Sequence, residues 1–98
     1  MTHPLEMLRD RFRDRAAADR GTLEVLAEGD LKSGELRRLI HNLSGTAGIF
    51  GFGALSQAAA EIDDQMAAGM PVDPTSLERL KVRLDEVVRR DPAAELAF

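Results

Sequence analysis

His41 is the interior histidine of this chain, and the residues around it favour chemistry at its ring. A histidine side chain titrates near neutrality, so much of it is neutral and nucleophilic at pH 7. Arg37 and Arg38 precede it by one helical turn, where they can stabilise an anion held on a ring nitrogen. Ser44, a possible hydrogen-bond donor, and Gly45 follow it by one turn. The spacing therefore indicates an accessible imidazole beside two cations.

The glycines after His41 are costly in a helix and need a physical reason. Each glycine inside a helix destabilises it by roughly 1 kcal/mol relative to alanine. Gly45 and Gly48 are expected on the exposed side, so access to the histidine explains them better than close packing of two helices. Gly51 and Gly53 are expected to end the helix and turn the chain.

Four segments with apolar residues at helical spacing must position this histidine. His41 lies about 140° from the centre of the second apolar stripe, which predicts that it points to solvent. Gly21 leaves open whether the first segment is one helix or two. The stripes are Leu5, Leu8, Phe12, Ala16, Leu23 and Leu26; Leu36, Leu39, Ile40, Leu43, Ala47 and Phe50; Leu55, Ala58, Ala59, Ile62 and Met66; and Leu77, Leu80, Leu84, Val87 and Val88.

Capping residues set the expected helix boundaries. Asp30 and Ser33 are both suitable N-caps for the second helix, and Asp73 is suitable for the fourth. Gly69 suits the end of the third helix, and Pro92 disfavours helix just before it. Four amphipathic helices with short connections predict an all-α, antiparallel up-and-down four-helix bundle. We expect one domain over 1–98, with a tail over 92–98 that either frays or docks.

Composition excludes several classes of function. The 98 residues include no cysteine, which removes disulfides, thiolate zinc sites and a cysteine nucleophile. The net charge is −4, with basic and acidic residues interspersed, so no nucleic-acid partner is expected. No apolar run approaches the ~20 residues that span a bilayer, so no membrane partner is expected and the cytoplasm is the expected location.

The stretch "IHNLSGTAGIFGFGALSQAAAEID" resembles the signature of histidine-containing phosphotransfer (HPt) domains of bacterial phosphorelays. In that signature a histidine is followed by an aliphatic residue and a glycine, then by a later glycine and a leucine-rich helix. His41 matches the phosphoacceptor, Leu43 the aliphatic residue and Gly45 the paired glycine. Gly51 matches the later glycine, and Leu55 opens the next helix.

The resemblance implies a phosphorelay intermediate. His41 would accept a phosphoryl group from the aspartate of a response-regulator or hybrid-kinase receiver domain and pass it to another receiver. The receiver would supply Mg²⁺, so no cofactor or metal is expected on this chain. No segment resembles a nucleotide-binding loop, which predicts no autonomous kinase activity. The family usually has lysine where this chain has Ser44, a departure that bears on rate and partner choice.

A set of residues around His41 is expected to dock the receiver or stabilise the phosphoryl group. Phe52 belongs to this set if the helix continues that far, because it would then share the face of His41; the alternative is that its ring packs under the turn before Leu55. The set is Arg37, Arg38, Ser44, Gly45, Gly48 and Phe52.

Other functions account for fewer of these features. A non-catalytic helical interaction or docking domain, such as an inactive HPt relative, remains the main alternative. A metal or haem bundle needs inward ligands from several helices, whereas this chain has only His41 and the N-terminal His3 as histidines. A hydrolase is disfavoured because no set of nucleophile, base and orienting residue is evident.

Overall fold

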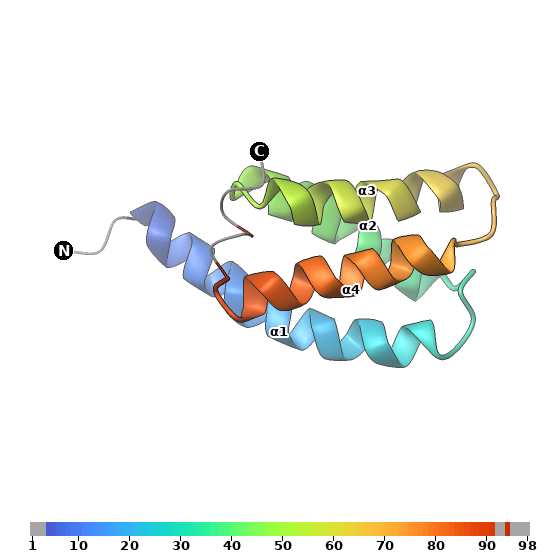
Figure 1. The fold of residues 1–98 in the computed structure, drawn as a ribbon, viewed down its shortest axis with the longest axis horizontal. Helices are drawn as coiled ribbons and strands as arrows, with labels where there is room; N and C mark the ends of the chain where they lie inside the picture. The colour runs from blue at the N-terminus through green and yellow to red at the C-terminus, as the bar shows by residue number, and fades with distance from the viewer. Residues whose placement is uncertain (1–3, 92–93, 95–98) are drawn as a thin grey trace.

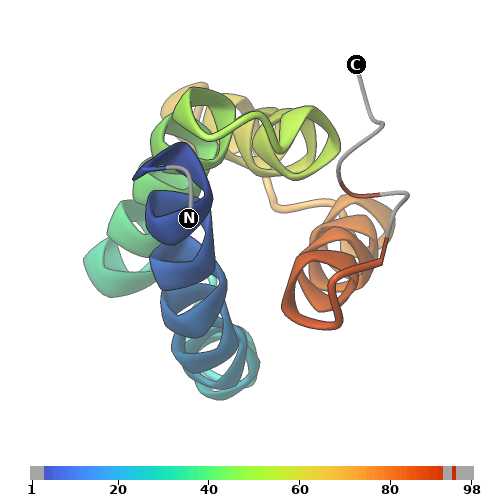
Figure 2. The ribbon, with the colours of Figure 1, turned by 90° about the vertical axis from the view of Figure 1, so that its left-hand side faces the viewer.

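The computed structural model describes residues 4–91 and residue 94, which contain four principal α-helices (Figure 1). These are α1 (Pro4–Ala27), α2 (Gly34–Ile49), α3 (Gly53–Ala67) and α4 (Pro74–Val88). Each helix packs against two neighbours, and α2 packs most extensively against α3. Figure 2 shows the helices around a shared interior. The predicted four-helix bundle is confirmed, whereas the tail lies, apart from Ala94, outside the described residues.

The apolar stripes predicted from the sequence form most of the core. α1 departs from its predicted stripe at its N-terminal end, which extends past the other helices (Figure 1). Leu5 and Leu8 are therefore exposed, and the buried part of α1 begins at Phe12. The buried apolar residues are Phe12, Ala16, Leu23, Leu36, Ile40, Leu43, Ala47, Phe52, Leu55, Ala58, Ala59, Ile62, Leu80, Leu84, Val87 and Ala94.

α1 is one continuous helix, which answers the question that Gly21 raised. Phe12 and Leu23 are buried on either side of this glycine. Burying a large apolar side chain stabilises a fold by about 1.5–3 kcal/mol, which exceeds the cost of roughly 1 kcal/mol for one helical glycine. Packing of the apolar face therefore keeps the helix intact through Gly21.

Two glycines with positive φ end α2 and α3 in the same way. Gly51 (φ 82°) follows α2, and Gly69 (φ 70°) follows α3. After α2, the N–H of Gly51 donates to the carbonyl of Gly48 (3.3 Å), and the N–H of Phe52 donates to that of Ala47 (2.9 Å). This pair of bonds is the Schellman motif, which needs a residue that tolerates positive φ. The tight turn allows α3 to return directly along α2.

Side-chain caps begin α2 and α4. The hydroxyl of Ser33 accepts from the N–H of Leu36 at 3.2 Å, so Ser33 rather than Asp30 is the N-cap of α2. Asp30 instead accepts from the backbone N–H of Lys32 in the preceding turn. Asp73 caps α4, as the sequence predicts. Both caps fix where the bundle helices start.

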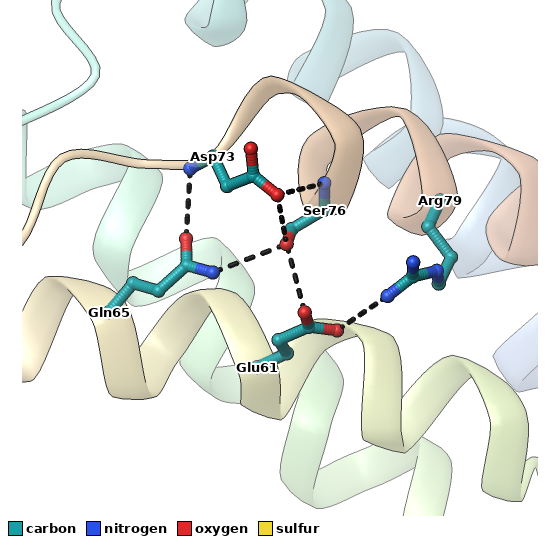
Figure 3. A network of polar contacts seen from close by, with 5 residues as sticks. All are labelled: Glu61, Gln65, Asp73, Ser76 and Arg79. Atoms are coloured by element: carbon teal, nitrogen blue, oxygen red, sulfur yellow. Dashed lines mark hydrogen bonds and ion pairs between the residues drawn. The ribbon is translucent and has the colours of Figure 1, made fainter.

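A polar network joins the start of α4 to α3 (Figure 3). The Ser76 hydroxyl is buried and lies 3.0 Å from Glu61 Oε1 and 3.1 Å from Asp73 Oδ2, and it accepts from Gln65 Nε2 at 3.2 Å. Its single proton can be donated to one carboxylate at a time. Arg79 donates to the second oxygen of Glu61 at 2.8 Å. The network satisfies a buried hydroxyl and fixes α4 against α3.

Candidate functional site

The imidazole of His41 lies on the exposed side of α2, as predicted. The neighbouring Ile40 and Leu43 face the core and are fully buried. The His41 side chain is 72% exposed, so a second molecule can reach its ring without any rearrangement of the bundle.

A carboxylate on α3 contacts this ring. Nδ1 of His41 lies 3.0 Å from Oδ2 of Asp63, whose side chain is 22% exposed. An ionised carboxylate only accepts hydrogen bonds, so Nδ1 carries the proton and donates it. In the neutral ring Nε2 then keeps its lone pair. The contact therefore makes Nε2 the nucleophilic nitrogen of His41.

Asp63 was not among the predicted site residues. Its pairing with His41 depends on how α3 is aligned along α2, which the helical pattern of either segment does not specify. A signal was nevertheless present, because His41 and Asp63 are equally far along the chain from Phe52 in the connecting turn. In an antiparallel helix pair, residues at equal distances from a short turn lie opposite one another.

Arg37 and Arg38 lie one turn before His41 and line the same shallow depression, together with Gly34 and Asp63. Both arginines are exposed. Within the part of the chain that the structure describes, neither forms an ion pair. Their charges are therefore available to an anion that approaches the ring of His41.

Gly45 and Ser44 lie one turn after His41. A Cβ atom added at Gly45 would meet nothing within 4 Å, so no packing contact within the described chain requires glycine there. The backbone carbonyl of Ser44 accepts from the hydroxyl of Ser56 at 2.7 Å, which joins α2 to α3. Gly45 therefore leaves open space beside the imidazole, as the access interpretation requires.

Gly48 has a packing contact that its place on the helical wheel did not indicate. A Cβ atom at this position would lie 3.2 Å from Oγ of Ser56 on α3, which is tighter than an ordinary contact. The expectation that close packing does not explain Gly48 is therefore wrong, whereas its role in access stays a prediction. α2 and α3 approach each other closely near the turn, and this close approach favours glycine at position 48.

The prediction that Phe52 belongs to the docking surface is also wrong. α2 ends before this residue, and the Gly51 turn directs the ring into the core, where it is 1% exposed. The ring stacks on Phe12 with centroids 5.3 Å apart, and the guanidinium groups of Arg9 and Arg13 lie over it. The alternative that the ring packs beneath the turn is confirmed.

The described residues contain neither a cluster of metal ligands nor a helix that could cross a membrane. Among residues 4–91 and 94, no three His, Cys, Asp or Glu side chains are grouped closely enough to hold a metal ion. In the same residues, no helix combines the length and the apolar character needed to cross a membrane.

Comparison with known proteins identifies the family. A family model described as the Hpt domain matches residues 7–90, which include most of α1 and all of α2, α3 and α4. No curated protein and no solved structure matches the chain. The family match covers most of the chain and includes the exposed histidine. The chain therefore belongs to the Hpt domain family, whose members are histidine phosphotransfer domains of phosphorelays and act as phosphotransfer intermediates rather than kinases.

Proposed function

We propose that His41 accepts a phosphoryl group from the phospho-aspartate of a receiver domain and passes it to the aspartate of another receiver. The observation that carries this proposal is the pairing of an exposed imidazole with Asp63, which leaves Nε2 as a nucleophile. Membership of the Hpt family supports the type of reaction. Receiver domains of response regulators or hybrid kinases are the proposed partners.

The proposed transfer from the receiver to His41 is balanced in atoms and in total charge. The lone pair of Nε2 attacks phosphorus in line with the bond to the receiver's carboxylate oxygen. The new N–P bond forms as the P–O bond breaks, and the aspartate leaves with that electron pair. The proton on Nδ1 stays in place, so the phosphorylated ring carries a positive charge beside the carboxylate of Asp63. The reverse sequence of bond changes delivers the phosphoryl group to a second receiver.

Charge and access around the ring favour this step. Arg37 and Arg38 are free to interact with phosphoryl oxygens, and Gly45 leaves room for the receiver. Ser44 takes the position of the usual lysine, so we assign its cationic role to these arginines. Phosphoryl transfer depends mainly on positioning and charge stabilisation. The receiver would bring Mg²⁺ and the remaining catalytic groups, and we expect no autonomous kinase activity from this chain.

Transfer from a phosphorylated receiver tests the proposal. The protein is incubated with a ³²P-labelled receiver domain, separated from it, and assayed for label that is stable to base and labile to acid. We expect the wild type and His3→Gln to take up label and His41→Gln to take up none. Equal labelling of the His41→Gln variant would refute the proposal. Receiver binding without any label on the wild type would instead support the alternative of a non-catalytic docking domain.

A further inference from the structure

A hollow lies at the end of the bundle where the α1–α2 and α3–α4 connections meet (Figure 1). We call it the loop-end hollow, and its volume is about 500 Å³. Sites for small molecules measure roughly 300–1,000 Å³ and are mostly apolar, with a few polar groups that orient the ligand. The loop-end hollow has this size and character, because its apolar lining comes from Leu31, Met66, Met70, Pro71 and Val72.

The apolar part of the hollow is held in place by the fold, yet part of it faces water. Leu31, Met66 and Val72 pack against the core, whereas the Met70 side chain is 60% exposed. The backbone N–H of Met70 donates to the carbonyl of Gln65 (2.9 Å), so the turn after α3 fixes the position of this residue. An apolar group that entered the hollow would remove this exposed surface from water, which favours binding.

Two cations line the same hollow. In residues 4–91 and 94, neither Lys32 nor Arg37 forms an ion pair or a side-chain hydrogen bond. Asp30 is the one carboxylate in the lining, and it accepts the backbone N–H of Lys32 at 2.8 Å. The lining therefore has a surplus of one positive charge, although the whole chain carries a net charge of −4. This surplus suits a ligand with a single negative charge.

We propose that the loop-end hollow binds a small amphiphilic carboxylate with an apolar chain like that of a medium-chain fatty acid. The apolar chain lies against Met66 and Met70, and the carboxylate lies between Lys32 and Arg37. The planar guanidinium of Arg37 matches a carboxylate through paired hydrogen bonds. Binding at this site does not involve the His41 ring, so it is independent of the proposed function.

Arg37 connects the hollow to His41, because its side chain lines both the loop-end hollow and the depression at the His41 ring. A carboxylate bound to Arg37 would compete with a phosphoryl group on His41 for the same guanidinium. Ligand binding and phosphorylation of His41 should therefore oppose each other, and each should weaken the other by the same factor. This coupling, unlike the binding itself, rests on the proposed function.

Titration with octanoate, followed by ¹³C NMR of the methionine methyl groups, tests the site. The signals of Met66 and Met70 should shift, whereas that of Met7, near the opposite end of the bundle, should not (Figure 1). We expect a Kd of about 1 mM or lower for a ligand of this size. Hexanoate lacks two methylene groups and should bind about 15-fold more weakly, since each buried methylene contributes about fourfold.

Matched variants test the two contacts separately. Arg37→Gln and Arg38→Gln each remove one cation before His41, but only Arg37 lines the hollow. We expect Arg37→Gln to weaken octanoate binding about fivefold and Arg38→Gln to change it less than twofold. Met70→Asp should abolish the binding, whereas Ile49→Asp, at an exposed apolar residue outside the hollow, should leave it unchanged.

Several results would overturn the site. These are equal shifts of the Met7 and Met70 signals, no shift at about 10 mM octanoate, a concentration well above the expected Kd, or equal weakening by Arg37→Gln and Arg38→Gln. Tighter binding of octyl phosphate than of octanoate would contradict the choice of a carboxylate. Binding to phosphatidylglycerol vesicles without binding of free octanoate would assign the hollow to a lipid surface instead.

Phosphoramidate, which phosphorylates histidine without a receiver, tests the coupling. Phosphorylation of His41 should weaken octanoate binding by the wild type at least about fivefold. The His41→Gln variant, treated in the same way, should keep its affinity. An unchanged affinity of the phosphorylated wild type would refute the coupling and leave the binding site in place. Failure of every receiver to label the wild type would refute the proposed function and would not alter octanoate binding.

Discussion

At His41, the hydrogen bond from Nδ1 to Asp63 determines which ring nitrogen can form a new bond. In the proposed transfer, the same carboxylate would face the positive charge that the ring acquires on phosphorylation. Asp63 does not touch the phosphoryl group in this account. It is a positioning residue that acts through the tautomer and the charge of the imidazole.

Replacing Asp63 with alanine tests this role. Hydrogen bonds to charged groups contribute about 1.5–3 kcal/mol, so we expect transfer to His41 to slow by roughly 10- to 100-fold. The proton of the neutral ring should also move from Nδ1 toward Nε2, which ¹⁵N NMR of the imidazole measures directly. Asp63→Asn keeps an acceptor without the charge and should give an intermediate rate. An unchanged tautomer in the alanine variant would contradict the positioning role.

Substitutions at Gly45 and Gly48 of α2 separate access from packing. Gly45→Ala should stabilise the protein by about 1 kcal/mol, because the site is open and helical. Gly48→Ala should stabilise it by less, because the new Cβ atom would press against Ser56. Denaturant unfolding measures both changes in the free energy of unfolding.

Gly45→Leu extends the same test to function. The variant should fold normally and accept phosphate from phosphoramidate, a small molecule, yet transfer from a receiver should slow by about tenfold or more because the side chain holds the receiver away from the ring. A receiver that transfers to this variant as fast as to the wild type would show that Gly45 does not provide access.

Among the elements, α2 and α3 together carry the candidate site. The way these two helices meet explains which predictions from the sequence succeeded and which did not. The apolar stripes and caps follow from local spacing, so the helices and the exposure of His41 were predictable from the sequence. The position of Phe52 depended on where α2 ends. α2 ends at Ile49, so the Phe52 ring lies beyond the Gly51 turn and does not share the face of His41. Asp63 was missed, and the packing contact of Gly48 was not expected, because both depend on how two helices meet, which no single-helix pattern records.

The α1–α2 groove contains a partly buried carboxyl group, Asp19, with a consequence for stability. Burial raises the pKa of Asp19 above its ordinary value of 3.8, and Arg15 only partly opposes this effect. The carboxyl side chain lines a hollow with Phe12, Leu39 and Asn42. The folded state therefore binds the Asp19 proton more tightly than the unfolded state does. The free energy of unfolding falls as the pH rises from the unfolded-state pKa through the raised folded-state pKa.

Asp19→Asn removes the ionisation and so tests its cost. We expect the variant to have a higher Tm than the wild type at pH 7, because there the partly buried Asp19 carries a charge whose desolvation destabilises the folded state. The difference should disappear toward pH 3, where both side chains are neutral. Thermal unfolding followed by circular dichroism between pH 3 and pH 7 measures this difference in Tm. A variant that is less stable than the wild type at pH 7 would show that the Arg15 pair outweighs burial.

For the whole molecule, the bundle acts as a rigid support that presents one imidazole and its surroundings to a partner. The polar network around Ser76 and the Schellman turns stabilise the helices without touching His41. The α2–α3 surface carries both the nucleophile and the cations that an incoming phosphoryl group needs. The proposed function therefore depends on docking of a receiver, which would supply the remaining catalytic groups.

The position of the transferred phosphoryl group shows whether Nε2 of His41 is the nucleophile. After transfer from a phosphorylated receiver, ¹⁵N and ³¹P NMR of the isolated protein identify the nitrogen that is bonded to phosphorus. We predict a single adduct on Nε2 of His41, with the proton retained on Nδ1. Phosphorus on Nδ1, on His3 or on no histidine of this chain would contradict the account.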